Sequence, residues 1–306
     1  MNSLKLQIAH LKETQDAMIM AHYYQAPEVQ DVADFLGDSL ALAQAVQQCR
    51  HRVIVLCGVR FMAETAKILN PDRIILIPDM QAGCSLADSV ELDELQQWIR
   101  EHPGSKVVTY INSTTQVKAL SDVIVTSANA RRIIESFPPD AKLLFTPDYY
   151  LGSYLNRVTG RQMMLWHGSC KVHEMFSESA VRELQKRFPA AEVLAHPECP
   201  TALLNLAHFV GSTTAIIRYA VESKLREFII VTEPGVIHQL KRRAPQKEFY
   251  PVSNTSGDPL NLCQDMRLTT LDKIVNCLTS LSPQIEMDEE LRIRALKPLK
   301  RMLELS

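Results

Sequence analysis

The sequence contains one pattern three times. Each copy opens with a short apolar stretch that ends in a polar residue, at His22, Tyr110 and His196, which lie 88 and 86 positions apart. A serine that begins a second helical stretch follows 16 or 17 positions later, and each copy closes on a loop that carries a cysteine. The serines are Ser39, Ser127 and Ser212, and the cysteines are Cys84, Cys170 and Cys263. Landmarks that keep their order and period predict three tandem copies of one α/β unit.

The fold class follows from how apolar runs alternate with helical stretches. Short, continuous apolar runs separated by helices are typical of parallel strands that are buried on both faces. We therefore predict an α/β protein made of three homologous three-layer α/β/α domains with parallel sheets. The expected divisions are 1–88 with an N-terminal helix, 89–173, 174–263, and C-terminal helices over 264–306 that pack back on the first repeat. The expected strands are 17–21, 53–57, 73–77, 106–110, 123–126, 142–146, 162–166, 192–195, 227–232 and 248–252. The expected helices are 1–16, 28–36, 39–49, 60–69, 92–101, 177–188, 267–281 and 288–305.

Composition excludes several classes of function. The 306 residues are 46% hydrophobic and 22% charged, with a formal net charge of −2. That charge provides no general attraction to nucleic acid or to a membrane, so any anion site must be built locally. No apolar run approaches the length of a membrane span, and residues 1–20 lack the arrangement of a signal peptide. Seven cysteines without framework spacing favour a reducing cytosol, and we expect a cytoplasmic protein.

Polar residues stand where the predicted strands end. In open parallel sheets the binding crevice lies at the carboxyl ends of the strands. We expect the three repeats to direct these residues and the three cysteine loops into one central cavity. The residues are His22, Tyr24, Tyr110, Asn112, His196 and Glu198.

Each of the three serines is in the position of a helix N-cap, and a single one is best interpreted as a cap. Three helix N-termini at matched positions are also suited to binding carboxylates or phosphate. We favour an anion site over three independent caps.

Prolines flank the segment from His196 to Glu198 and stiffen it. A histidine and a carboxylate two positions apart in a rigid loop can serve as an acid/base pair, although a plain turn with a solvated glutamate fits equally well. Tyr24 and Tyr110 occupy equivalent strand ends. Tyrosines there often only pack, but two at matched points suggest groups that polarise a substrate.

The cysteines allow two kinds of metal centre. His167, Cys170 and His173 follow one another at three-residue intervals and resemble part of a zinc site, but no second close pair of ligands accompanies them. One cysteine on each of three repeats is better suited to a cubane iron–sulfur cluster with one iron that lacks a cysteine ligand. Spacing alone does not decide between iron–sulfur and zinc.

Taken together, these motifs resemble the quinolinate synthase family of de novo NAD biosynthesis, over nearly the whole chain and in family order. The matching segments are AHYYQ (21–25), GDS (37–39), GCSLA (83–87), YINS (110–113), TSAN (126–129), CKVHE (170–174), HPEC (196–199), GSTT (211–214), TE (232–233) and CQDM (263–266).

The resemblance implies three domains with pseudo-threefold symmetry around a [4Fe–4S] cluster held by Cys84, Cys170 and Cys263. It implies a transferase that condenses iminoaspartate with dihydroxyacetone phosphate to quinolinate, with loss of phosphate and two waters, the open iron acting as a Lewis acid. It also suggests coupling to an L-aspartate oxidase or dehydrogenase as the source of iminoaspartate. The implied proton-transfer residues are Tyr24, His196 and Glu198. The implied substrate-holding residues are His22, Ser39, Tyr110, Asn112, Ser127, Ser212 and Thr213.

Two other functions remain open. One is an iron–sulfur hydro-lyase that acts on a single small hydroxy acid. The other is a non-catalytic sensor that carries a cluster or zinc and binds small acids without turnover. The acid/base pair and the two tyrosines favour catalysis, because a sensor needs no proton relay.

Overall fold

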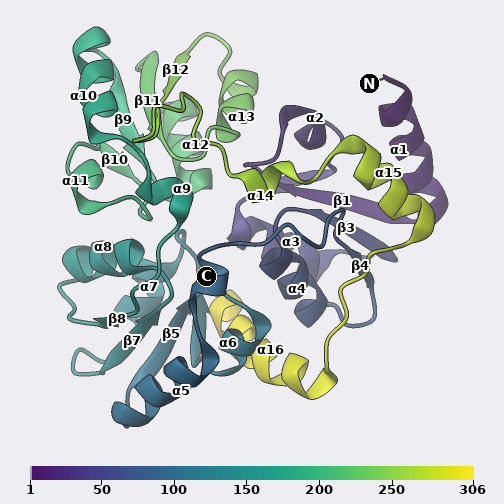
Figure 1. Cartoon of the computed structure of the whole chain (residues 1–306), viewed down its shortest axis with the longest axis horizontal. Helices are drawn as coiled ribbons and strands as arrows, with labels where there is room; N and C mark the ends of the chain where they lie inside the picture. Colours follow the sequence, from purple (N-terminus) through teal and green to yellow (C-terminus); the bar gives the residue numbers. More distant parts are fainter. Residues whose placement is uncertain (1) are drawn as a thin grey trace.

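The computed structural model describes residues 2–306 and contains three parallel four-stranded sheets (Figure 1). Their strand orders are β2-β1-β3-β4, β6-β5-β7-β8 and β10-β9-β11-β12, which is the same order three times. The strands are β1 (Ala17–His22), β2 (Phe35–Gly37), β3 (Val53–Cys57), β4 (Ile74–Leu76), β5 (Lys106–Tyr110), β6 (Val123–Val125), β7 (Leu143–Thr146), β8 (Met164–Leu165), β9 (Glu192–Ala195), β10 (Phe209–Val210), β11 (Glu227–Val231) and β12 (Glu248–Pro251). The predicted α/β class with parallel sheets is confirmed.

Helices connect successive strands and cover the sheets. In the first two repeats they are α1 (Asn2–Gln15), α2 (Pro27–Gln30), α3 (Ser39–Gln48), α4 (Arg60–Leu69), the 3₁₀ helix η1 (Ala87–Ser89), α5 (Leu92–Glu101), α6 (Thr115–Ala119), α7 (Ala130–Glu135) and α8 (Tyr149–Thr159). The remainder are α9 (Lys171–Glu174), α10 (Glu178–Arg187), α11 (Thr201–Leu204), α12 (Thr213–Glu222), α13 (Val236–Arg243), α14 (Gln264–Arg267), α15 (Leu271–Ser280) and α16 (Glu289–Glu304). No helix within residues 2–306 is both long and apolar enough to cross a membrane.

The first sheet shows why the strands are apolar throughout. Successive side chains of a strand point to opposite faces. Met20 packs in a cluster with Leu42 of α3 and Ile68 of α4, whereas its neighbour Ile19 packs with Ile8 of α1 on the other face. Both faces of the sheet are therefore covered by helices, and the unit has three layers.

The third sheet is built in the same way. One of its faces packs on α12 and α13, and the other packs on α10 and α11. Phe228 and Ile229, which are adjacent on β11, belong to these two different clusters. The three-layer arrangement therefore recurs along the chain.

Two strands were missed by the sequence prediction. The helix expected over 28–36 is wrong, because α2 ends at Gln30 and Phe35–Gly37 pairs with β1 as an edge strand. The two-residue strand β10 pairs with β9 at the equivalent edge of the third sheet. Both strands correspond to β6 of the second repeat, which the sequence did predict from its Val-Ile-Val run, whereas β2 (Phe-Leu-Gly) and β10 (Phe-Val) contain no such β-branched run.

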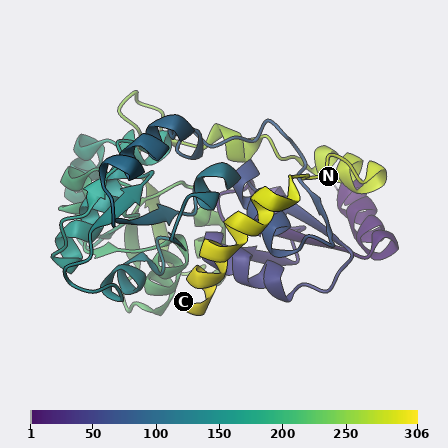
Figure 2. The ribbon, with the colours of Figure 1, turned by 90° about the horizontal axis from the view of Figure 1, so that it is seen from below.

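The C-terminal helices contact two different repeats. Helix α15 packs against α1, while α16 contacts α6 and β6 of the second repeat and α4 of the first. Figure 2 shows α16 running across the molecule between these two units. The predicted boundaries of these helices agree closely with the structure, although the stretch expected as 267–281 is divided into α14 and α15.

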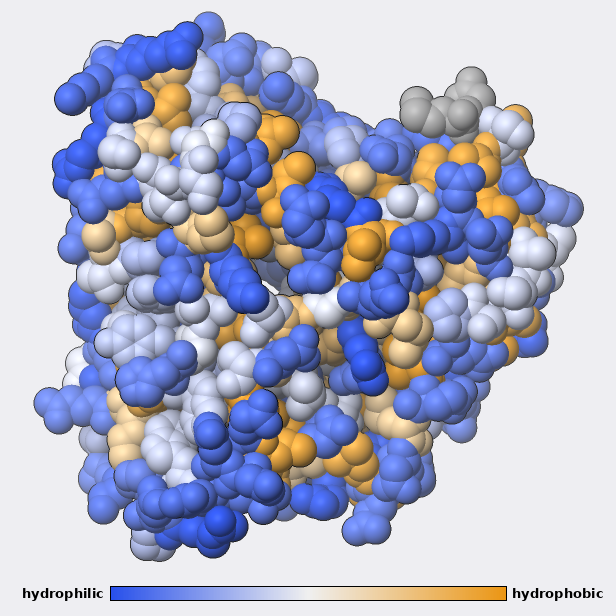
Figure 3. All heavy atoms as spheres, viewed as in Figure 1, coloured by the Kyte–Doolittle hydropathy of each residue, from blue (hydrophilic) through white to orange (hydrophobic). Residues whose placement is uncertain are grey.

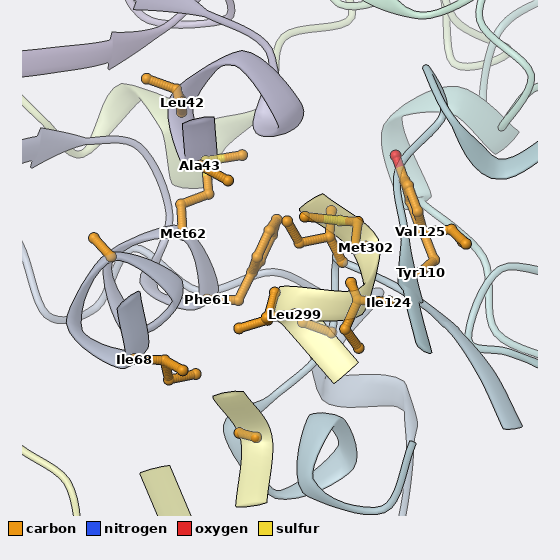
Figure 4. Close-up of a cluster of buried hydrophobic side chains, with 14 of the residues drawn as sticks. Leu42, Ala43, Phe61, Met62, Ile68, Tyr110, Ile124, Val125, Leu299 and Met302 are labelled. Atoms are coloured by element: carbon orange, nitrogen blue, oxygen red, sulfur yellow. The ribbon is translucent and has the colours of Figure 1, made fainter. Parts of the chain in front are cut away.

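Helix α16 helps to form the core that the first two repeats share. Leu299 and Met302 lie between Phe61 of α4 and Ile124 of β6 (Figure 4). All four side chains are nearly or completely buried. The helix therefore stabilises the junction of the two repeats through apolar contacts.

We expect Leu299→Ala to destabilise the folded chain by about 2–5 kcal/mol, because it removes apolar contacts and leaves a cavity at this junction. Ile293→Ala on the same helix is the matched control, since Ile293 is 54% exposed. The control is expected to change stability by less than roughly 0.5 kcal/mol. Chemical denaturation of both variants measures the difference, and equal midpoints would contradict the role assigned to α16.

Candidate active site

The carboxyl ends of the three sheets border one cavity of about 380 Å³. Figure 3 shows that the surface is hollowed near the middle of the molecule, where the three units meet. The cavity is lined by every predicted site residue except Ser212. These residues are His22, Tyr24, Ser39, Cys84, Tyr110, Asn112, Ser127, Cys170, His196, Glu198, Thr213 and Cys263.

The topology explains this convergence. His22 is the last residue of β1, Tyr110 is the last of β5, and His196 directly follows β9. These are the first strands of the three repeats, and each lies in the interior of its sheet. Side chains at their carboxyl ends therefore reach the crevice that open parallel sheets form.

Glu198 is the most highly connected group in the cavity. Its Oε1 accepts a hydrogen bond of 2.5 Å from the Tyr110 hydroxyl, and its Oε2 lies 2.8 Å from Nδ1 of His173. Burial alone would raise the pKa of Glu198, but the adjacent His173 and the hydrogen bond from Tyr110 hold it well below its usual range. The carboxylate is therefore ionised.

The two histidines at the strand ends are neutral. Burial lowers the pKa of His196 to about 3 and that of His22 to about 4, even though Glu198 and Asp38 act in the opposite direction. The Nε2 of His196 lies 3.2 Å from the hydroxyl of Ser127. A neutral imidazole can donate with one nitrogen and accept with the other, which suits proton movement at this point.

Tyr24 lies within a chain of hydroxyl groups. Its phenol oxygen is 2.9 Å from Oγ1 of Thr213 and 2.7 Å from Oγ1 of Thr232. Burial, followed by the charge of Glu198, raises the pKa of Tyr24 well above its ordinary value. Tyr24 is therefore a neutral hydrogen-bond donor and is poorly suited to act as a base.

The three serines do not have the same role in the structure. Only Ser212 is a helix N-cap, accepting the N–H of Ala215 at 3.3 Å, and it lines an adjoining groove rather than the cavity. The cap interpretation is wrong for Ser39, because α3 is capped by Asp38, whose side chain accepts the N–H of Ala41. It is also wrong for Ser127, because the N-cap position of α7 is Asn129, whose side chain makes no capping bond. The hydroxyls of Ser39 and Ser127 line the cavity instead.

Three of the seven cysteines line the cavity. Burial raises the pKa of Cys84 to about 12 and that of Cys263 to about 11, and it raises that of Cys170 well above the ordinary value. Each of these thiols is close enough to another of the three for their charges to interact. The other cysteines, Cys49, Cys57, Cys199 and Cys277, are buried outside the cavity lining.

One group of side chains is close enough to hold a single metal ion. Ligand atoms of Cys170, His173 and Glu198 lie within 4.8 Å of one another, and no other such group occurs in the part of the chain that the structure describes. The expected zinc ligand His167 is not part of it, because its exposed ring stacks on Tyr149 with centroids 5.6 Å apart. The zinc interpretation based on His167 is therefore wrong.

Two buried residues in the cavity wall were missing from the predicted catalytic and substrate-holding residues: His173, considered only as a possible zinc ligand, and Glu233, which was assigned no role. His173 contacts both Glu198 and Cys170, and its Nδ1 lies 3.3 Å from the sulfur. Glu233 follows β11, accepts the N–H of Cys263 at 3.3 Å, and pairs with Arg267 at 2.7 Å. Both residues lie in segments that match the family, which was the signal that could have identified them.

An ionised carboxylate, neutral imidazoles, phenol donors and three thiols in one buried cavity define an enzyme that acts on a small molecule. Comparison with known proteins agrees. The family model described as "Quinolinate synthetase A protein" matches residues 6–304. The curated quinolinate synthase of Chloroherpeton thalassium is 50% identical over 98% of this chain and 94% of its own length. That of Thermosynechococcus vestitus is 51% identical over the same shares. The chain belongs to the quinolinate synthase family.

Two serine variants separate capping from binding. Ser212→Ala removes a helix cap and is expected to cost about 1 kcal/mol of stability. Ser127→Ala removes a hydroxyl of the cavity and is expected to change stability by less than roughly 0.5 kcal/mol. It should weaken the binding of a dicarboxylate or phosphate ligand by roughly 1–2 kcal/mol. Thermal melts and calorimetric titration measure the two effects. A large loss of stability in Ser127→Ala with normal binding would contradict this assignment.

Proposed function

We propose that this protein condenses iminoaspartate with dihydroxyacetone phosphate to form quinolinate, with loss of phosphate and two waters. The observation that carries the proposal is the buried Glu198 carboxylate, placed between Tyr110 and His173 in a cavity that also contains three thiols. The relatives named quinolinate synthase support the same reaction. We also propose the class transferase, a cytoplasmic location, and a supply of iminoaspartate from an L-aspartate oxidase or dehydrogenase.

We propose that Cys84, Cys170 and Cys263 hold a [4Fe–4S] cluster. The donor set fits, because three half-buried thiols from three loops line one cavity. They are not grouped within 4.8 Å as ligands of a single ion would be, which suits a larger polynuclear centre. Such a cluster, with one iron free of cysteine, supplies a Lewis acid for a substrate oxygen.

The chain's own residues provide binding and proton transfer in this proposal. Ser39, Ser127 and Thr213 offer hydroxyls to carboxylate and phosphate oxygens, with His22 beside them. Tyr110 also belongs to the substrate-holding set. Asn112 has a buried Oδ1 with no hydrogen-bond partner within residues 2–306, so its amide is available to a ligand. We retain Ser212 in this set through the backbone end of α12 rather than through its hydroxyl, which is used as a cap.

Glu198 is the proposed general base. Condensation of an imine with a triose phosphate requires protons to move on and off carbon and oxygen several times. A buried carboxylate next to the neutral His196 can take a proton selectively, whereas free solvent cannot. Tyr24 and His196 complete the proton path as donor and relay, which agrees with their neutral states.

The domain divisions 1–88, 89–173, 174–263 and 264–306 remain a proposal, as does a pseudo-threefold relation around the cavity. The equal strand order of the three sheets supports both. A hydro-lyase or a non-catalytic sensor is the competing function. Product analysis separates them, because a hydro-lyase turns over one substrate alone and a sensor turns over none.

We predict that Cys84→Ser, Cys170→Ser and Cys263→Ser each abolish the cluster, because each removes one thiolate ligand. Cys49→Ser is the matched control, since Cys49 does not line the cavity and its thiol donates to the sulfur of Met18. Cys57→Ser and Cys277→Ser should also retain the cluster. Iron and sulfide analysis after anaerobic purification measures the result. A Cys170→Ser protein with full iron occupancy would overturn the ligand assignment.

Glu198→Gln keeps the size of the side chain and part of its hydrogen bonding but removes the base. We expect the cluster to remain, substrates to bind, and turnover to fall by roughly 10²–10⁴-fold. Anaerobic kinetics with iron content measured on the same sample gives the answer. Near-normal turnover at full iron occupancy would exclude Glu198 as the base.

A further inference from the structure

Lys118 is a fully buried cation close to the cavity wall. Its exposed fraction is 0%, and it is one of the largest completely buried side chains among the described residues. The ammonium donates to the carbonyl oxygen of Ser113, its one hydrogen-bond acceptor among residues 2–306. Lysine is rarely buried to this extent unless it is paired, because an isolated charge is costly in a low-dielectric interior. The position of Lys118 therefore requires an explanation.

A second buried lysine provides the comparison. Lys247 is 7% exposed, and its ammonium donates to the carbonyls of Ala220 at 2.7 Å, Val221 at 3.1 Å and Ser223 at 2.5 Å. All three of its donors are thus used at the end of α12. Both lysines also lie over an aromatic ring, at 5.6 Å from the Phe228 centroid for Lys247 and 5.4 Å from that of Phe61 for Lys118. Lys247 is satisfied by local carbonyls, whereas Lys118 is not.

The surroundings of Lys118 link it to the loop that carries Cys84. Phe61, over which its ammonium lies, lines the cavity together with Cys84. The preceding residue Arg60 donates its N–H to the carbonyl of Ala82 at 2.7 Å, which attaches α4 to the Cys84 loop. Lys118 thus lies against Phe61, a side chain of the cavity wall, and does not line the cavity itself.

The charges that act on Lys118 come from two directions. Burial lowers the pKa of Lys118 to about 8, while Glu64 and then Cys84 act to raise it, so the ammonium is charged at neutral pH. Glu64 already forms an ion pair with Arg60 at 3.0 Å and accepts a hydrogen bond from the hydroxyl of Thr115 at 2.9 Å. Among residues 2–306 no carboxylate forms an ion pair with Lys118, so the charge of the ammonium is not balanced by a direct partner.

We propose that Lys118 is a positioning cation for the metal centre. Its fixed positive charge compensates the negative charge that three cysteine thiolates bring to a bound iron–sulfur cluster. The inference rests on the proposed cluster and assigns Lys118 no contact with substrate. Its consequence is electrostatic: removing the charge favours the more oxidised, less negative cluster and loosens its retention.

The test compares Lys118→Met with Lys247→Met, each purified anaerobically with its cluster. Methionine fills a similar volume without charge, so Lys118→Met should fold. We expect its midpoint potential, followed by visible absorbance or electron paramagnetic resonance, to move to a more negative value. Iron loss to a chelator should also become several-fold faster. Lys247→Met should match the unmodified protein in both measurements.

Glu64→Gln provides a second variant with the opposite sign. It removes the anion that opposes Lys118 while keeping an acceptor for Thr115, so the midpoint potential should move to a less negative value. If the substitutions only displaced the Cys84 loop, the midpoint potentials of the two variants would not be expected to move in opposite directions. Equal potentials and chelation rates in Lys118→Met and Lys247→Met would overturn the inference. If the unmodified protein binds no iron and sulfide, the proposed cofactor itself fails, which is a distinct outcome.

Discussion

The site depends on one buried carboxylate that is kept ionised. Glu198 is 3% exposed, and a charge at such a depth is tolerated only when hydrogen-bond donors surround it. Tyr110 and His173 meet its two oxygens, and His196 lies 3.8 Å away on the same loop. These partners come from different repeats, so the ionised state of Glu198 requires the assembled fold.

The repeated topology brings these partners together. Each repeat places the end of its first strand at the same sheet edge, and each contributes one cysteine loop to the same cavity. The shared core between α4, β6 and α16 keeps the first two repeats in contact, and Glu233 attaches the third cysteine loop to the end of β11. Packing at a distance from the cavity therefore determines the geometry inside it.

Much of this arrangement could be predicted from the sequence. The period of the repeat shows which strand ends and which cysteines are equivalent, and this requires no knowledge of tertiary contacts. The edge strands β2 (Phe-Leu-Gly) and β10 (Phe-Val) escaped detection, because neither contains a β-branched run like the Val-Ile-Val of β6. The contact of His173 with Glu198 could not be predicted, since it joins two loops through the tertiary fold. Lys118 was equally hidden, because a lysine in a short helix normally faces solvent. The capping role of Asp38 was missed because it adjoins Ser39, and the two residue types compete for the same N–H groups.

The most direct test of the account is anaerobic purification of the unmodified protein, followed by iron and sulfide analysis and assay with iminoaspartate and dihydroxyacetone phosphate together. The account predicts one [4Fe–4S] cluster per chain, and quinolinate formed only when both substrates are present. It also predicts that air removes cluster and activity together, because one iron lacks a protein thiolate. Quinolinate formation by protein that contains no iron or sulfide would contradict the account.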